Sequence, residues 1–209
     1  MITPLFVRYT RLPVTAAAIC MLWLFFSCRT APPPIPKYIM GSGLLNQNEL
    51  ASFFLTQAPE IEREKTVRLA GYYIEEAAAE GINSDIAFAQ MCLETGFLRF
   101  GGLVTADMNN FCGLGAINQE NRGLSFPDER TGVRAHIQHL KAYASAEPLK
   151  FPSVDPRYRY VNPKGKAPDI HSLAGTWAAD TAYGHKIANL LRRMYAHTGI
   201  PRTAAGKNR

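Results

Sequence analysis

The sequence predicts a mainly α (α+β) domain, in which a helical lobe and a small β-hairpin lobe form a cleft. Two segments, 60–80 and 181–197, carry apolar residues at the three- and four-residue spacing of amphipathic helices. Between them, residues 98–128 break that rhythm with five glycines, which favours loops and short strands. Of the 209 residues, 47% are hydrophobic and 19% are charged, which excludes a disordered chain, a collagen-like repeat and a multi-span membrane protein.

The first 27 residues are expected to be a lipoprotein-type signal peptide. Two arginines precede an uncharged run, 12–27, which is shorter than the about 20 residues of a bilayer-spanning helix. Ser27 and Cys28 resemble a bacterial lipoprotein cleavage site, so Cys28 is the expected lipidation site. An ordinary signal cut near Ala31 and an uncleaved anchor are the alternatives. All three place the domain outside the cytoplasm, membrane-anchored as the first choice and secreted as the second.

Composition divides the remaining chain into a linker, a domain and a tail. Residues 28–45 are rich in Pro and Gly, residues 46–200 hold the helical patterns, and residues 201–209 are small and basic. The formal net charge is +6, but no dense run of Lys and Arg occurs, so nucleic-acid binding is not expected. The positive excess suits either an anionic cell-wall polymer or simple solubility. We expect a monomer.

Helix start and stop signals define the elements of the N-terminal half. Asn48 is expected to cap a short helix that runs to Gln57, where an Ala-Pro pair ends it. The long helix over 60–80 has apolar residues spaced among charged ones, and Gly81 is expected to end it. Both boundaries are predicted from capping and terminating residues close by in the sequence.

The C-terminal half is expected to alternate between loops and helices. Residues 98–128 are expected to form loops with a small β-hairpin or three short strands. A helix over about 130–145 precedes a Pro-rich, aromatic loop at 146–168. A short helix near 169–175 and a longer one from about 181 to 197 complete the domain.

Glu94 is the most informative carboxylate in the chain. It lies near the end of a helix predicted over 85–96, with Asn83 or Ser84 as its cap, and the residues from 86 to 93 are uncharged. Partial burial and the nearby helix C-terminus would both raise the pKa of such a carboxyl, as a general acid needs. From spacing alone, a solvated Glu at a frayed helix end is the favoured alternative.

Four motifs follow one another in the order found in one enzyme family. They are Glu94-Thr95-Gly96, Asn109 to Ala116, Phe126 to Arg134, and Trp177 to Ile187. Together they resemble the glucosaminidase domain, glycoside hydrolase family 73, a mannosyl-glycoprotein endo-beta-N-acetylglucosaminidase-like group, over about residues 60–197. Members of that family have a lysozyme-like fold and cleave bacterial peptidoglycan, so the resemblance implies this fold and this substrate.

The resemblance also implies roles for individual residues. Glu94 matches the family's general acid, which protonates the oxygen of the β-1,4 bond between N-acetylglucosamine and the following N-acetylmuramic acid. Tyr183 matches a tyrosine that lines the cleft near the reaction centre. Asn110 and Phe111 match a loop that faces the sugar chain. These matches reverse the preference for a solvated Glu94.

A second catalytic group is not marked by one motif. Glycoside hydrolysis usually uses two carboxyl groups, and the candidates are Asp107, Glu120, Asp128 and Glu129. Glu120 ranks first because it lies in the expected β lobe, on a loop that would face the cleft. Two alternatives remain: the acetamido group of the substrate acts instead, or none of the four carboxylates is essential.

Aromatic residues after 150 are candidates for sugar stacking. Phe151, Tyr158, Tyr160 and Trp177 present faces that suit the apolar faces of pyranose rings. The alternative is that they pack the loop against the helices. Packing is the favoured role for Trp177, whereas Tyr158 and Tyr160 stay open between the two.

Neither metal binding nor cysteine catalysis is expected. His136 and His139 lie three residues apart without a ligand partner at suitable spacing, so we expect polar groups on the flank of a helix. Cys92 and Cys112 belong to elements that touch in lysozyme-like folds, so a disulfide between them is possible outside the cytoplasm. No metal or organic cofactor is implied.

The sequence therefore predicts a peptidoglycan hydrolase, attached to the membrane by a lipid anchor, whose partner is the glycan strand. Two alternatives stay open. A lysozyme or lytic transglycosylase would act on the muramic acid bond from a related fold. A non-catalytic peptidoglycan-binding lipoprotein would keep the cleft without the chemistry.

Overall fold

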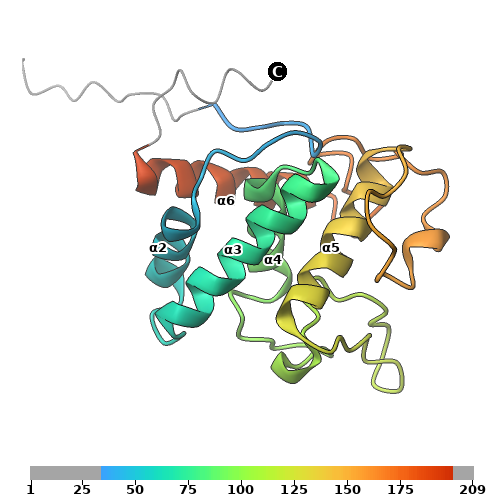
Figure 1. Cartoon of the computed structure of the whole chain (residues 1–209), viewed down its shortest axis with the longest axis horizontal. Helices are drawn as coiled ribbons and strands as arrows, with labels where there is room; N and C mark the ends of the chain where they lie inside the picture. The colour runs from blue at the N-terminus through green and yellow to red at the C-terminus, as the bar shows by residue number, and fades with distance from the viewer. Residues whose placement is uncertain (1–33, 200–209) are drawn as a thin grey trace, which may run out of the picture. The chain divides into compact units, whose positions relative to one another are not determined.

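The computed structural model describes residues 34–199, and within this range the fold is mainly helical, as the sequence predicts. Figure 1 shows α3 lying between α2 and α5, and the three helices pack in that order. The helices are α2 (Gln47–Gln57), α3 (Arg63–Glu80), α4 (Ser84–Glu94), α5 (Glu129–Ala144) and α6 (Tyr183–Thr198), with short 3-10 turns η2 (Ala106–Met108) and η3 (Tyr158–Tyr160).

Helix α4 is the centre of the packing. All residues from Ser84 to Cys92 are buried, and the helix contacts α2, α3, α5 and α6. The stretch from Ile86 to Leu93 is uncharged on every side, and such a helix is stable only where other elements surround it, which explains this position. Asn83 is the cap, since its side chain accepts the N–H groups of Asp85 and Ile86. The helix ends at Glu94, so that carboxylate lies at the edge of the core.

One of two predicted helix boundaries follows a different residue, and the other is confirmed. Helix α2 begins at Gln47 with Asn46 as its cap, so the prediction of Asn48 is wrong. The Asn46 side chain accepts the N–H groups of Asn48 and Glu49, and the Glu49 side chain accepts the N–H of Asn46, which makes a complete capping box. Gly81 ends α3 as predicted, at a left-handed φ of 75°.

Residues assigned to the linker on composition pack partly on the domain. Ile39 and Leu45 are buried, and the Asp85 carboxylate accepts the N–H groups of Leu44 and Leu45, at 2.8 and 3.3 Å from Oδ2 and Oδ1. The Tyr195 hydroxyl of α6 also donates to Asp85, at 2.7 Å. The packed domain thus includes residues before position 46, because a buried carboxylate on α4 needs these donors.

The predicted hairpin in 98–128 is not formed. The described residues contain no strand, and within 98–128 one isolated antiparallel bridge joins Ala116 to Arg122. Between them the Asn118 side chain accepts the N–H groups of Glu120 and Asn121 and closes a tight turn. Glycine and asparagine disfavour strands, so this segment folds as turns held by local side-chain bonds.

The helix expected at 169–175 is also absent, and turns replace it. The Asp169 side chain accepts the N–H groups of His171 and Ser172, which offers the backbone an alternative to a helix. Helix α6 then begins at Tyr183. A Cβ atom at Gly184 would lie 2.5 Å from the Ile170 carbonyl oxygen, so only glycine allows α6 to start this close to the preceding turns.

Ion pairs join α3 to α5 beside the core. Glu76 is buried on α3 and bonds Arg130 and Arg134 at 2.7 Å each, while Glu80 and Lys141 form a buried pair at 2.8 Å. These contacts fix the register of α5, whose first turn supports the loop opposite Glu94. The expected signal peptide at 1–27, Cys28 and the tail at 201–209 lie outside the described residues. Within 34–199, no helix is long and apolar enough to span a bilayer.

Candidate active site

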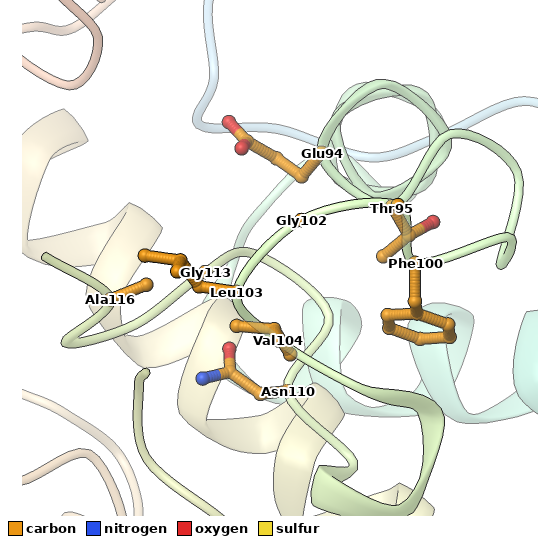
Figure 2. Close-up of a pocket in the computed structure, with 10 residues that line it drawn as sticks. Glu94, Thr95, Phe100, Gly102, Leu103, Val104, Asn110, Gly113 and Ala116 are labelled. Carbon is orange, nitrogen blue, oxygen red and sulfur yellow. The ribbon is translucent and has the colours of Figure 1, made fainter. Parts of the chain in front are cut away.

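A pocket opens at the C-terminal end of α4. Figure 2 shows the Glu94 side chain entering it from one side, with Leu103, Val104, Asn110 and Ala116 across from it. The remaining lining residues are Thr95, Phe100, Gly101, Gly102 and Gly113. Among these lining residues, Glu94 alone carries a carboxylate. One wall is therefore helical and carries the ionisable group, and the other wall is a glycine-rich loop.

The Glu94 carboxylate receives two hydrogen bonds on the same oxygen. The Tyr183 hydroxyl, in the first turn of α6, donates to Oε1. The Trp177 indole N–H donates to the same Oε1 at 3.0 Å. Among the described residues, no hydrogen bond to Oε2 occurs. The two bonds to Oε1 thus orient the carboxyl, and Oε2 stays available to a ligand in the pocket.

The environment favours the protonated form of Glu94. The residue is exposed in the pocket, but the surrounding protein atoms crowd its carboxyl, and this desolvation raises the pKa above the ordinary value. The bonds from Tyr183 and Trp177 lower the pKa and offset part of that rise. Burial and the adjacent carboxylate raise the pKa of Tyr183, so this residue remains a phenol and acts as a donor. A general acid has this combination of properties.

Behind Tyr183 lie three further polar residues to which the sequence analysis gave no role at this site. Gln90 donates from Nε2 to the Tyr183 hydroxyl at 2.9 Å, and its Oε1 lies 3.0 Å from His136 Nε2. His136 Nδ1 lies 2.8 Å from the Tyr73 hydroxyl. Burial lowers the pKa of His136 to about 3, and its expected place on a helix flank is wrong because it is fully buried. A signal existed: Gln90 precedes Glu94 by one helical turn in an otherwise apolar stretch.

Asn110 and Phe111, expected to face the sugar, are committed to the loop and the core. Asn110 lines the pocket, but its amide donates to the carbonyls of Leu114 and Leu124 and accepts the Leu114 N–H. Phe111 is buried and packs near Phe100, with ring centroids 6.5 Å apart. Asn110 therefore shapes the loop wall as part of it, and Phe111 supports that wall from the core.

The four candidates for a second carboxylate all lie outside the lining of the pocket. Asp128 caps α5 by accepting the Thr131 N–H, and Glu129 pairs with Arg68 at 2.9 Å. Asp107 is exposed in η2, and a hydrogen bond with the Thr105 side chain lowers its pKa. Glu120 lies exposed at the tip of the turn held by Asn118.

The aromatic candidates divide between two places. Trp177 is half-buried against Tyr143 and His139, with centroids 5.1 and 5.2 Å away, so it packs as favoured but also bonds Glu94. Tyr158 lines a second hollow formed by residues 153–159, and Tyr160 is exposed. The functional contact of Trp177 was missed because its partner is distant in sequence.

The remaining candidates concern cysteines and metals. Cys92 and Cys112 are free, buried thiols, so the possible disulfide between them is not formed, and burial raises the pKa of each. His139 bonds Asp155 at 2.7 Å. Within residues 34–199, no group of three or more His, Cys, Asp or Glu side chains is placed to hold a metal ion.

A single carboxyl with a raised pKa, aimed into a pocket at the end of a buried helix, is typical of the general acid of a glycoside hydrolase. Comparison with known proteins agrees with this class. Residues 70–196 match the glucosaminidase family, described as mannosyl-glycoprotein endo-beta-N-acetylglucosaminidase. The chain belongs to this family of glycoside hydrolases.

A relative of the chain is an uncharacterized protein of Borreliella burgdorferi. The two are 42% identical over 157 residues, which cover 75% of this chain and 76% of the relative. No solved structure matches the chain. The family membership confirms the glucosaminidase domain that the four sequence motifs predict.

Proposed function

We propose that this protein hydrolyses the β-1,4 bond between N-acetylglucosamine and N-acetylmuramic acid in peptidoglycan, with Glu94 as the general acid. One observation carries the proposal. The Glu94 carboxyl lines the pocket, has a raised pKa and is held on Oε1 by Tyr183 and Trp177, while Oε2 has no hydrogen bond among the described residues. The family's description as an endo-beta-N-acetylglucosaminidase supports N-acetylglucosamine as the sugar whose bond is cleaved.

The reaction begins with proton transfer from Glu94. Because two donors occupy Oε1, the acid proton resides on Oε2. Oε2 gives this proton to the glycosidic oxygen as the bond from that oxygen to C1 of N-acetylglucosamine breaks. The muramic acid leaves as an alcohol, and Glu94 is left ionised. Tyr183 and Trp177 stabilise that anion through hydrogen bonds to a charged acceptor.

The proposal assigns the second catalytic role to the substrate. Glu94 is the sole carboxylate among the residues that line the pocket, which supports this choice. The acetamido oxygen attacks C1 as the leaving group departs and forms a cyclic intermediate, as in substrate-assisted glycoside hydrolases. Water then opens this ring at C1 and returns a proton to Glu94. The product carries a reducing N-acetylglucosamine end.

Attachment to the membrane through Cys28 is part of the same proposal. The motif around Cys28 and the preceding uncharged run support it, together with the extracytoplasmic location of peptidoglycan. Metabolic labelling with a palmitate analogue tests this point: label in the wild-type chain and its loss in Cys28→Ala would support the anchor. Label retained in Cys28→Ala would contradict it.

The activity is tested with purified full-length protein and purified peptidoglycan. Glu94→Gln removes the acid and keeps the size of the side chain. Glu147→Gln is the matched control, because that glutamate is exposed and does not line the pocket. Released fragments are reduced with borohydride and identified by mass spectrometry. General acid catalysis contributes about 10²–10⁴-fold, so Glu94→Gln is expected to lose about a thousandfold in rate.

The ends of the fragments decide between the alternatives. Reduced N-acetylglucosamine ends, formed by wild type and Glu147→Gln and lost with Glu94→Gln, would support the proposal. Reduced muramic acid or anhydro-muramic acid ends would instead identify a lysozyme or lytic transglycosylase. Binding of peptidoglycan without release of fragments by a folded wild-type protein would identify a non-catalytic binding module.

A further inference from the structure

Four buried or nearly buried side chains connect the candidate acid to the centre of the helical core. Glu94 is bonded by Tyr183, Tyr183 by Gln90, Gln90 by His136, and His136 by Tyr73. The three inner contacts measure 2.9, 3.0 and 2.8 Å in that order. Each of the three inner links joins a different pair of helices, so α6, α4, α5 and α3 each contribute one of the four side chains.

The hydrogens along this series run in one direction. The single proton of the Tyr183 hydroxyl goes to the Glu94 carboxylate, so Tyr183 must accept from the amide NH₂ of Gln90. The Gln90 carbonyl then faces His136 and accepts its Nε2–H. His136 is therefore the Nε2–H tautomer, and its bare Nδ1 accepts the Tyr73 hydroxyl proton. Every donor points toward Glu94.

The direction persists when Glu94 gains its proton. A proton on Oε1 would meet both the Trp177 N–H and the Tyr183 O–H, so it resides on Oε2 instead. Tyr183 then keeps its role as donor to Oε1, and Gln90 keeps its orientation. Hydrogen bonds aligned head to tail polarise one another, so each inner member strengthens the bond to the acid.

The titratable side chains within this series, other than Glu94, are neutral. Burial raises the pKa values of Tyr73, Tyr183 and Cys112, and burial together with the nearby His139 lowers that of His136. Tyr73 is fully buried, so the series ends inside the core without an exit to solvent. It therefore holds dipoles in place and does not conduct protons.

We propose that Gln90, His136 and Tyr73 are positioning residues for the acid, and that they aim the Tyr183 hydroxyl at Oε1 so that the Glu94 proton stays on Oε2, facing the substrate. Their catalytic meaning rests on the proposed function. The orientation of the carboxyl is a property of the folded protein and is measurable without substrate.

The decisive measurement is the pKa of Glu94, followed by carbon-13 NMR of glutamate-labelled protein. The variants are Tyr183→Phe, Gln90→Met and the double variant. Met matches the length of Gln and its helix preference but removes both amide functions. The bond from Tyr183 lowers the Glu94 pKa, so its loss is expected to raise that pKa. Gln90→Met is expected to raise it by less, since Tyr183 still reaches Oε1.

The double variant separates positioning from general damage. If Gln90 acts through Tyr183, the Glu94 pKa in the double variant equals that in Tyr183→Phe alone. Shifts that add in the double variant, or an unchanged pKa in Gln90→Met, would overturn the proposal. Tyr73→Phe is the milder second probe at the far end, and a small rise in the Glu94 pKa is expected. An unchanged pKa there would remove Tyr73 from the series.

Rates give a second readout. Gln90→Met is expected to lower kcat about tenfold, which corresponds to the free energy of about one hydrogen bond. The basic limb of the pH–rate profile is expected to move to higher pH, and KM is expected to stay unchanged. Ile86→Val, a buried change on the same helix that removes one methyl group and none of the hydrogen bonds of the series, is expected to leave that limb in place. A limb that moves equally in both variants would indicate general loosening of α4 and overturn the proposal. An inactive wild type would refute the proposed function but leave the NMR test intact.

Discussion

The two walls of the pocket are built on different principles. In the helical wall, Glu94 is held by side chains from α6 and from the loop at 177, which lie 89 and 83 positions away in the sequence. In the loop wall, Asn110 bonds backbone groups only 4 and 14 positions away. The first wall therefore depends on the packing of the whole domain, whereas the second is held mainly by its own turns.

Backbone conformation sharpens the contrast. The segment after Glu94 places Phe97, Leu98 and Phe100 at φ values of 58°, 61° and 49°, where side chains are disfavoured. Such strain costs of order 1–3 kcal/mol per residue and persists when the surroundings impose it. In contrast, the helices of the other wall have regular backbones and buried side chains. The comparison indicates an acid positioned by packing between helices, which faces a loop wall whose strained backbone is held in place by its surroundings.

The largest expected effect concerns the pH dependence of folding through His136. Its pKa is about 3 in the folded state and 6.5 when unperturbed, so between these values the unfolded chain binds more protons. Stability is therefore fully present above pH 6.5 and falls as the pH drops toward 3, by roughly 3 kcal/mol between pH 7 and pH 4 at about 1.4 kcal/mol per pH unit.

Urea unfolding of wild type and His136→Gln at both pH values measures this contribution. The variant is expected to be less stable at pH 7, because Gln90 and Tyr73 lose their partner. Between pH 7 and pH 4, the variant is expected to lose less free energy of unfolding than wild type, by the roughly 3 kcal/mol that His136 contributes. A variant that loses as much as wild type over this range would show that His136 does not stay neutral in the core.

The loop wall should respond to a change on α5. A Cβ atom at Gly132 would lie 1.8 Å from the Asn109 carbonyl oxygen, so Gly132→Ala must move one of the two backbones. We expect a loss of about 1–3 kcal/mol in the free energy of unfolding. Gly101→Ala, where no heavy atom lies within 4 Å, is the control and should change stability far less. Equal stability of the two variants would contradict the close approach.

Removing one donor from the helical wall should have a moderate effect. Trp177→Phe keeps an aromatic ring but loses the N–H that bonds Glu94. We expect about a tenfold lower rate and a higher Glu94 pKa, because that bond lowers the pKa in the native protein. The basic limb of the pH–rate profile should therefore move to higher pH. Tyr143 packs against the same indole, so Tyr143→Phe is the control. If the basic limb moves as far in Tyr143→Phe as in Trp177→Phe, the role assigned to the Trp177 N–H is refuted.

The smallest effect is expected at Glu120. Its side chain is exposed at the tip of a turn and outside the lining of the pocket, so Glu120→Gln should change the rate on peptidoglycan by less than about twofold. A loss of about a hundredfold or more would mean that the loop wall closes over the substrate and brings this carboxylate to the sugar. The loop wall would then contribute to catalysis as well as to the shape of the pocket.

The sequence by itself determined the helical class, the central helix that is uncharged from Ile86 to Leu93, and the position of Glu94 at the end of that helix. Local chemistry is sufficient for these features, since periodicity, the Asn83 cap and the Gly81 terminator act within a few residues. Local chemistry also explains two errors. Asn46 and Asn48 are equally good caps by type, and the bonds of Asp169 to its own neighbours replaced a predicted helix with turns.

Only the tertiary structure decided which polar side chains serve the acid. Gln90 meets Tyr183 across 93 positions, and His136 meets Tyr73 across 63, so no local pattern reports these contacts. The same holds for Trp177, whose indole packs like a core residue while its N–H reaches Glu94. A buried polar group is stable only with a partner, and that partner is fixed by how distant helices pack, not by the residues beside it in the chain.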